Sequence, residues 1–281
     1  MTDFGVFMFA TDYAIQPKEL AIEVEARGFE SLFFPEHTHI PTSRRTARPG
    51  GGDLPQEYWH LHDPLVALAT AAAVTERIKV GTGILLVPEH DPIVKAKQIA
   101  SLDMASGGRV VIGIGGGWNA EELEHHGVAF KDRWKVTREC VLAWRELWNE
   151  EEAEFHGDFI DFERSWSYPK PVTPGGPPVL MGAESKWAYD RIAEYCDGWL
   201  PRNGRVDLRE GLESLRAACD RAERDFNELQ LSLFGAQNDE ANCSAAIELG
   251  FQRLIFMLPP APADEVLPLL DTYAALAEKL G

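Results

Sequence analysis

Eight short apolar runs alternate with helical patterns along this chain, and the alternation limits the fold more than any other feature. Most of these runs are continuously apolar, which is typical of strands that are covered on both faces. A chain in which strands and helices alternate builds a parallel sheet with helices packed around it. The predicted strands cover residues 4–9, 31–34, 79–84, 109–113, 179–181, 198–200, 230–234 and 253–257.

Eight strand and helix pairs favour a closed (β/α)8 TIM barrel of the α/β class, with an open doubly wound sheet as the alternative. The chain has 281 residues, 45% of them apolar, which is enough for one large core. We therefore expect residues 1–281 to form a single barrel domain. Asp63-Pro64 and Asp91-Pro92 each place a capping carboxylate before a proline, which predicts a helix start at both positions.

Two segments interrupt the repeat. Residues 38–58 form a long loop after the second strand, on the side where a barrel carries its active site. The loop contains Arg44, Arg45 and Arg48. Residues 153–172 alternate between apolar and polar positions and contain prolines, so we expect a short hairpin inserted before the fifth strand.

Composition restricts the partners. The formal net charge of -18 arises from 45 acidic and 27 basic residues and would repel nucleic acid and an anionic membrane surface. The sequence shows neither a basic leader nor an apolar run of roughly 20 residues. Its four cysteines form no Cys-x-x-Cys pair, as expected of buried thiols in a reducing compartment. We expect a cytoplasmic protein that acts on a small molecule, without nucleic-acid or membrane partners.

The second strand delivers Glu36 and His37 to its carboxyl end, where the reactive groups of a barrel gather. An imidazole and a carboxylate suit proton transfer, although a structural His37 hydrogen-bonded to Glu36 is an alternative. The spacings His37-x-His39 and His60-x-His62 also allow a metal site. Because the later strands end in glycine or proline and add no ligands, we predict that no metal is bound.

Glycine-rich turns follow the fourth and fifth strands and open helices. Such turns let the backbone approach a ligand, and the free amides of a helix start favour an anion such as phosphate, although plain turns without a ligand are the alternative. Gly81 and Gly83 inside the third strand indicate a bulge, either under a planar ring or as a bend of the barrel. The turn residues are Gly116, Gly117 and Asn119 after the fourth strand, and Gly182, Ala183, Glu184 and Ser185 after the fifth.

Six segments distributed over nearly the whole chain carry a family resemblance. They are residues 31–41, 80–84, 91–97, 102–109, 113–119 and 197–199. In this order they resemble the luciferase-like monooxygenase superfamily, and within it the branch of oxidoreductases that use the deazaflavin coenzyme F420. One position departs from the pattern: Trp118 stands where relatives acting on sugar phosphates or methanopterins carry a glutamate, which argues against those substrates and that proton acceptor.

The resemblance implies a (β/α)8 barrel with the cofactor at the carboxyl ends of its strands. It also implies a non-prolyl cis peptide bond between Gly83 and Ile84 behind the cofactor ring, and catalytic roles for His37 and Glu36. The cofactor contacts that it implies come from Glu36, His37, Gly83, Ile84, Gly116, Gly117, Asn119, Gly182, Ala183, Glu184 and Ser185.

The expected function is hydride transfer between coenzyme F420 and a small organic substrate, with His37 giving or taking the accompanying proton. The coenzyme carries an anionic tail of glutamates, and residues 42–48 hold three arginines and no acid. We therefore predict that Arg44, Arg45 or Arg48 meets this tail. The alternatives are an FMN-dependent monooxygenase and a flavin- or deazaflavin-binding protein without turnover. Family members often dimerise, which makes a homodimer a further expectation.

Overall fold

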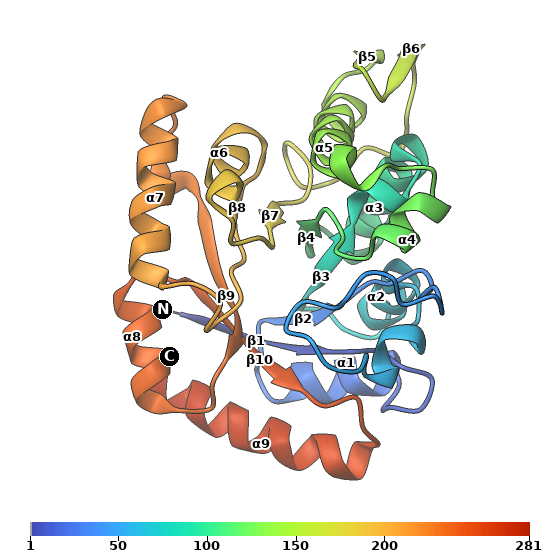
Figure 1. Ribbon diagram of the computed structural model, residues 1–281. Coiled ribbons are helices and arrows are strands. Elements are labelled where there is room, and N and C mark those ends of the chain that lie inside the picture. Colours follow the sequence, from blue (N-terminus) through green and yellow to red (C-terminus); the bar gives the residue numbers. More distant parts are fainter. Residues whose placement is uncertain (1) are drawn as a thin grey trace.

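Eight parallel strands close into a barrel in the computed structural model, which describes residues 2–281 (Figure 1). The order around the barrel is β1-β10-β9-β8-β7-β4-β3-β2, and pairing of β1 with β10 completes the circle. The predicted (β/α)8 class is thereby confirmed and the open sheet is excluded. The barrel strands are β1 (Asp3–Met8), β2 (Ser31–Phe34), β3 (Lys79–Leu86), β4 (Val110–Gly115), β7 (Val179–Met181), β8 (Gly198–Trp199), β9 (Gln230–Ala236) and β10 (Arg253–Leu258).

Helices surround the barrel on the outside (Figure 1). The predicted helix starts are confirmed, because Asp63 accepts a hydrogen bond from the Val66 amide at 2.9 Å and Asp91 accepts one from the Val94 amide at 2.8 Å. Within residues 2–281, none of the helices combines the length and apolar character needed to cross a membrane. The helices are α1 (Pro17–Ala26), α2 (Pro64–Ala72), α3 (Pro92–Ser106), α4 (Ala120–His125), α5 (Arg133–Asn149), α6 (Lys186–Tyr195), α7 (Leu208–Arg221), α8 (Glu240–Glu248) and α9 (Ala263–Leu280).

The interior of the barrel is a packed core. Burial of each large apolar side chain contributes roughly 1.5–3 kcal/mol, so this layer and the larger one between strands and helices hold the scaffold together. Residues from the carboxyl ends of the strands pack on top of the inner layer. The buried inner residues are Phe7, Phe33, Val111, Leu180, Leu200 and Ile255, and Phe9, Ile84, Phe234 and Met257 pack against them.

The predicted hairpin is formed by β5 (Ala153–His156) and β6 (Asp161–Ser165), which pair antiparallel and extend beyond α5, away from the barrel (Figure 1). The buried carboxylate of Glu139 on α5 anchors its turn. It accepts hydrogen bonds from the backbone amides of Phe159 at 2.8 Å and Ile160 at 3.0 Å. Burial of a carboxylate is tolerated here because backbone donors satisfy it.

The bulge predicted in β3 is present, and the peptide bond between Gly83 and Ile84 is cis, as the family resemblance implied. The side chain of Ile84 fills space that two neighbouring strands leave open. A Cβ atom at Gly115 would lie 2.0 Å from the Ile84 side chain, and one at Gly182 would lie 2.6 Å from it. Glycines are therefore required at both positions to accept Ile84 in this conformation.

Candidate active site

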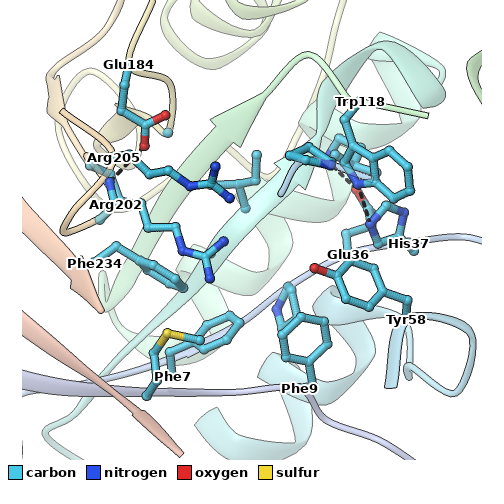
Figure 2. A pocket seen from close by; sticks show the side chains of 18 residues that line it. Phe7, Phe9, Glu36, His37, Tyr58, Trp118, Glu184, Arg202, Arg205 and Phe234 are labelled. Atoms are coloured by element: carbon cyan, nitrogen blue, oxygen red, sulfur yellow. Dashed lines mark hydrogen bonds between the residues drawn. The ribbon is translucent and has the colours of Figure 1, made fainter. Parts of the chain in front are cut away.

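A cavity of about 320 Å³ opens at the carboxyl ends of the barrel strands (Figure 2). Its size falls within the range of small-molecule sites. The floor is apolar and aromatic, with polar side chains on two opposite sides. The lining residues are Phe7, Phe9, Pro35, Glu36, His37, Pro49, Tyr58, Gly83, Ile84, Leu86, Trp118, Gly182, Glu184, Leu200, Arg202, Arg205, Phe234 and Met257.

His37, just beyond β2, is held by two partners. Its Nδ1 lies 2.7 Å from Glu122 Oε2, and Trp118 Nε1 donates to its Nε2 at 3.3 Å. Because an indole nitrogen only donates, Nε2 carries the lone pair and Nδ1 carries the hydrogen that Glu122 accepts. We call His37, Trp118 and the adjoining Tyr58, with Glu122 behind them, the histidine wall. A carboxylate on one nitrogen orients the imidazole and stabilises its protonated form, so the other nitrogen can accept a proton.

Glu36 lines the cavity but holds the backbone rather than His37. Its Oε2 accepts a hydrogen bond from the Leu86 amide at 2.6 Å, and its Oε1 lies 2.9 Å from His90 Nε2. The carboxylate thus ties the end of β2 to the end of β3. The alternative of a structural pair between His37 and Glu36 is wrong, because Glu122 takes that place.

Glu122 is a functional candidate that sequence reasoning missed. It lies on α4, shortly after the glycine-rich turn. The family resemblance placed a glutamate at the position of Trp118 and not at Glu122. Its side chain is 1% exposed, so its role depends on the contact with His37 across 85 positions of sequence. Its place in the first turn of α4 does not by itself point to His37.

The structure brings together only part of the predicted cofactor set. Glu36, His37, Gly83, Ile84, Gly182 and Glu184 line one cavity. The remaining members lie outside that lining: Gly116, Gly117, Asn119, Ala183, Ser185, Arg44 and Arg45. In the turn after β4 it is Trp118 that faces the cavity, while Gly116 packs against Trp134 and the buried Asn119 caps α4.

The predicted arginine loop contributes differently from expectation. The Arg44 guanidinium lies 5.8 Å from the centre of the Trp118 ring, and Arg45 pairs with Glu124 on α4 at 2.5 Å. From the same loop, Pro49 and Tyr58 reach the cavity. Arg44 and Arg45 therefore contact Trp118 and α4, and none of the three loop arginines lines the cavity.

Arg202 and Arg205, beyond β8, line the side opposite His37, and sequence reasoning missed both. Figure 2 shows their guanidinium groups reaching into the cavity across from Trp118 and Tyr58. Among residues 2–281, no hydrogen bond or ion pair engages either guanidinium group. We call this pair the arginine wall. A sequence signal exists for Arg202, because it directly follows Pro201 at the end of a predicted strand, where a barrel carries its functional groups.

Glu89 forms a second buried carboxyl group behind the histidine wall. Burial, followed by the negative charges of Glu122 and Glu36, raises the pKa of Glu89 to about 9. At neutral pH this side chain is therefore an uncharged carboxylic acid.

The histidines considered for a metal site make other contacts. His39 Nε2 lies 2.8 Å from His125 Nδ1, His60 contacts Asp12, and His62 contacts Gln16. Over the described residues 2–281, no group of three or more His, Cys, Asp or Glu side chains is arranged to hold a metal ion.

Comparisons with known proteins bear on the fold and the family of the chain. An uncharacterized protein of Mycobacterium tuberculosis (strain H37Rv) is 38% identical over 275 residues, which cover 97% of each chain. Among solved structures, the monooxygenase RslO1 from Streptomyces bottropensis gives a TM-score of 0.78 at 17% identity and covers 99% of both chains. An F420-dependent secondary alcohol dehydrogenase in complex with an F420-acetone adduct gives 0.76 at 16% identity and covers 98% of both.

These two structural likenesses show the fold. The family follows from the sequence, because the profile described as luciferase-like monooxygenase matches residues 7–278. The chain belongs to the luciferase-like monooxygenase family.

Proposed function

We infer that the protein is an oxidoreductase that transfers a hydride between coenzyme F420 and a small organic substrate, with His37 as the proton donor and acceptor. The observation that carries this inference is the histidine wall. It combines a cavity-lining imidazole, a buried carboxylate on Nδ1 and an indole hydrogen on Nε2, all from different parts of the chain. This arrangement suits a reaction that moves one proton at a substrate oxygen or carbon.

The cavity fits a planar ring with an anionic extension. Gly83 lets the aromatic floor pack tightly against β3, since a Cβ there would lie 3.1 Å from Phe234 and 3.2 Å from Phe7. Aromatic and aliphatic side chains suit a heteroaromatic ring, and the arginine wall offers two cations to a phosphate or carboxylate. Gly83 and Ile84 would support the ring, and Gly182, Arg202 and Arg205 would hold the anionic part. When bound, the deazaflavin supplies or accepts the hydride.

The remaining chemistry belongs to the side chains. In the direction of alcohol oxidation, the substrate hydroxyl would displace the Trp118 hydrogen bond at His37 Nε2 and give its proton to that nitrogen, and Glu122 would stabilise the imidazolium that forms. In the direction of reduction, the imidazolium returns this proton. Tyr58, Trp118 and the aromatic floor limit the access of water to the reacting atoms. Proton transfer by a positioned group contributes roughly 10²- to 10⁴-fold to a rate.

An FMN-dependent monooxygenase is the second candidate, and the arginine loop favours it. Arg44 and Arg45 contact Trp118 and Glu124, outside the cavity, so they do not form a ready site for a long anionic tail. FMN has a single phosphate, which the arginine wall alone could hold. The family profile and the likeness to RslO1 support oxygen chemistry in the same fold.

A titration of the purified protein with coenzyme F420 and with FMN, followed by cofactor fluorescence, separates the candidates. Tighter binding of F420, together with oxidation of its reduced form by ketones or reduction of its oxidised form by secondary alcohols, supports the leading proposal. Tighter binding of FMN with substrate-dependent oxygen consumption supports the second candidate. Tight binding without turnover of any probe supports a carrier, and binding of neither cofactor contradicts all three.

A further inference from the structure

A chain of polar side chains leads from His37 away from the cavity and towards the surface. Its first link is the 2.7 Å contact between His37 Nδ1 and Glu122 Oε2. The His37 and Glu122 side chains are 6% and 1% exposed, so water does not reach this contact. The other oxygen of Glu122, Oε1, is buried and lacks a partner when both neighbouring carboxyl groups are ionised.

Glu89 supplies the second link. Both of its oxygens are buried and, like Glu122 Oε1, would be unpartnered as carboxylate oxygens. A proton on Glu89 removes this conflict, because its hydroxyl can donate to Glu122. The raised pKa of Glu89, which burial causes first and the charges of Glu122 and Glu36 reinforce, agrees with this protonation. The two carboxyl groups thus share one proton at neutral pH.

The third link reaches the surface histidines, His39, His125 and His126. Thr38 lies beside Glu89, and its Oγ1 lies 2.8 Å from His126 Nε2 and 2.9 Å from His39 Nδ1. His126 Nε2 is 3.8 Å from Glu89 Oε2. Burial, then the charges of His39 and His90, lowers the pKa of His126, so at neutral pH this imidazole is an uncharged proton acceptor.

Several elements around Glu89 place polar groups near its carboxyl group. The titratable or hydroxyl groups that act on Glu89 are Glu36 beyond β2, Thr38 in the long loop, and Glu122 and His126 at α4. Among them, the carboxyl pair Glu122 and Glu89 alone joins the cavity imidazole to the surface histidines. The path therefore runs behind the cavity and stays open when ligands fill it.

We propose that protons reach and leave His37 through Glu122, Glu89 and the surface histidines. This inference rests on the proposed role of His37. When Nε2 takes a proton from the substrate, the hydrogen on Nδ1 passes to Glu122, and Glu89 releases its own proton to Thr38 and His126 and from there to water. One proton enters from the substrate at His37 and one leaves at the surface histidines. Glu122 and Glu89 together hold one proton before and after the transfer. Glu122 and Glu89 are positioning residues, since they act through His37.

The first test needs no cofactor. Infrared spectra of the full chain at pH 7 should show the carbonyl band of a protonated carboxyl group, and Glu89→Gln should remove it. The matched control is Glu121→Gln on α4. Burial opposes ionisation of Glu121, but hydrogen bonds from Thr46 outweigh it and hold its pKa at about 2, so this variant should keep the band. A Glu89→Gln protein that folds and keeps the band overturns the proposal.

The second test follows the proton itself. In protein labelled with ¹⁵N-histidine, exchange of the His37 Nδ1 hydrogen with water should slow in Glu89→Gln on the order of 10²-fold, the lower end of what a positioned proton-transfer group contributes. The amide of this variant can still donate to Glu122 but cannot pass a proton. His126→Asn should slow exchange in the same sense, and Glu121→Gln should leave it unchanged. Equal exchange rates in Glu89→Gln and the unsubstituted protein overturn the proposal.

The two proposals fail separately. If the protein binds neither F420 nor FMN, the proposed function is wrong whatever the exchange data show. If it binds F420 and transfers a hydride while Glu89→Gln exchanges the His37 hydrogen at the original rate, the function stands and the path is wrong.

Discussion

The two polar sides of the cavity are built in opposite ways. In the histidine wall, the central groups are held by their neighbours: His37 contacts Glu122 and Trp118, and the Arg44 guanidinium lies over Trp118. In the arginine wall, Arg202 and Arg205 are exposed, and their backbone amides are held while their guanidinium groups are not. The Arg202 amide donates to Glu184 at 2.8 Å, and the Arg205 amide donates to the Arg202 carbonyl at 3.1 Å. Preorganised groups suit a fixed chemical step, while free guanidinium groups can adapt to different anions. In the function that we propose, the first wall carries the chemistry and the second recognises the ligand.

The largest expected effect tests the histidine wall. His37→Ala should lower kcat/KM by roughly 10²- to 10⁴-fold while cofactor binding changes little, because the proton-transfer group is lost and the arginine wall is intact. Steady-state kinetics and a fluorescence titration measure the two quantities. His62→Ala, which removes a histidine bonded to Gln16 outside the cavity, is the control. Full turnover in His37→Ala would show that His37 is not the proton-transfer group.

The arginine wall should show the reverse pattern. Replacing Arg202 and Arg205 together with alanine should weaken cofactor binding by about 10- to 100-fold, since charge-assisted hydrogen bonds contribute about 1.5–3 kcal/mol. At saturating cofactor, kcat should be nearly unchanged. The paired lysine variant keeps the charge without the bidentate geometry and should lie in between. A fall in kcat with unchanged cofactor affinity would contradict the assignment of cofactor binding to Arg202 and Arg205.

Glu89, the buried carboxyl group behind the histidine wall, should make stability depend on pH. The folded protein keeps a proton on Glu89 up to a pKa of about 9, whereas the unfolded chain loses it near its ordinary value of 4.5. The free energy of unfolding should therefore contain a contribution that is complete below about pH 4.5 and is lost as pH rises towards 9, at no more than about 1.4 kcal/mol per pH unit.

Urea unfolding at several pH values measures this contribution. Glu89→Gln, which cannot titrate, should remove it and flatten the profile over the same interval. The arginine wall has no corresponding feature, so the double alanine variant of Arg202 and Arg205 should keep the slope. Identical profiles for Glu89→Gln and the unsubstituted protein would show that Glu89 is ionised in the folded state.

The smallest effect concerns the arginine loop. The triple alanine variant of Arg44, Arg45 and Arg48 should lose a small part of its affinity for long-tail F420 and none for a tailless form, because exposed charges act weakly. Fluorescence titrations with both forms measure the difference. If the variant and the unsubstituted protein bind long-tail F420 with equal affinity, the loop arginines do not contact the tail of the cofactor.

Local signals explain what could be predicted from sequence. The strands are continuous apolar runs, and the positions of His37 beyond the second strand and of Gly83 within the third follow from the chain order of the barrel. Contacts between distant segments left no such signal: Glu122 reaches His37 across 85 positions, and Tyr58 reaches the cavity from an irregular loop. The protonation of Glu89 depends on burial beside two other carboxylates, which neither its own neighbours in sequence nor composition reveals.

Ile84 determines how deep a molecule the site can admit. Its side chain occupies the gap above Gly115 and Gly182, between the cavity and the strands β4 and β7. Shortening it to valine or alanine would lengthen the cavity downwards and leave the proton-handling and anion-binding sides in place. If the cofactor ring rests on Ile84 as proposed, homologous barrels with a smaller residue here should leave more room behind the ring, and the same position is the first one to vary in redesigning this chain for a bulkier cofactor.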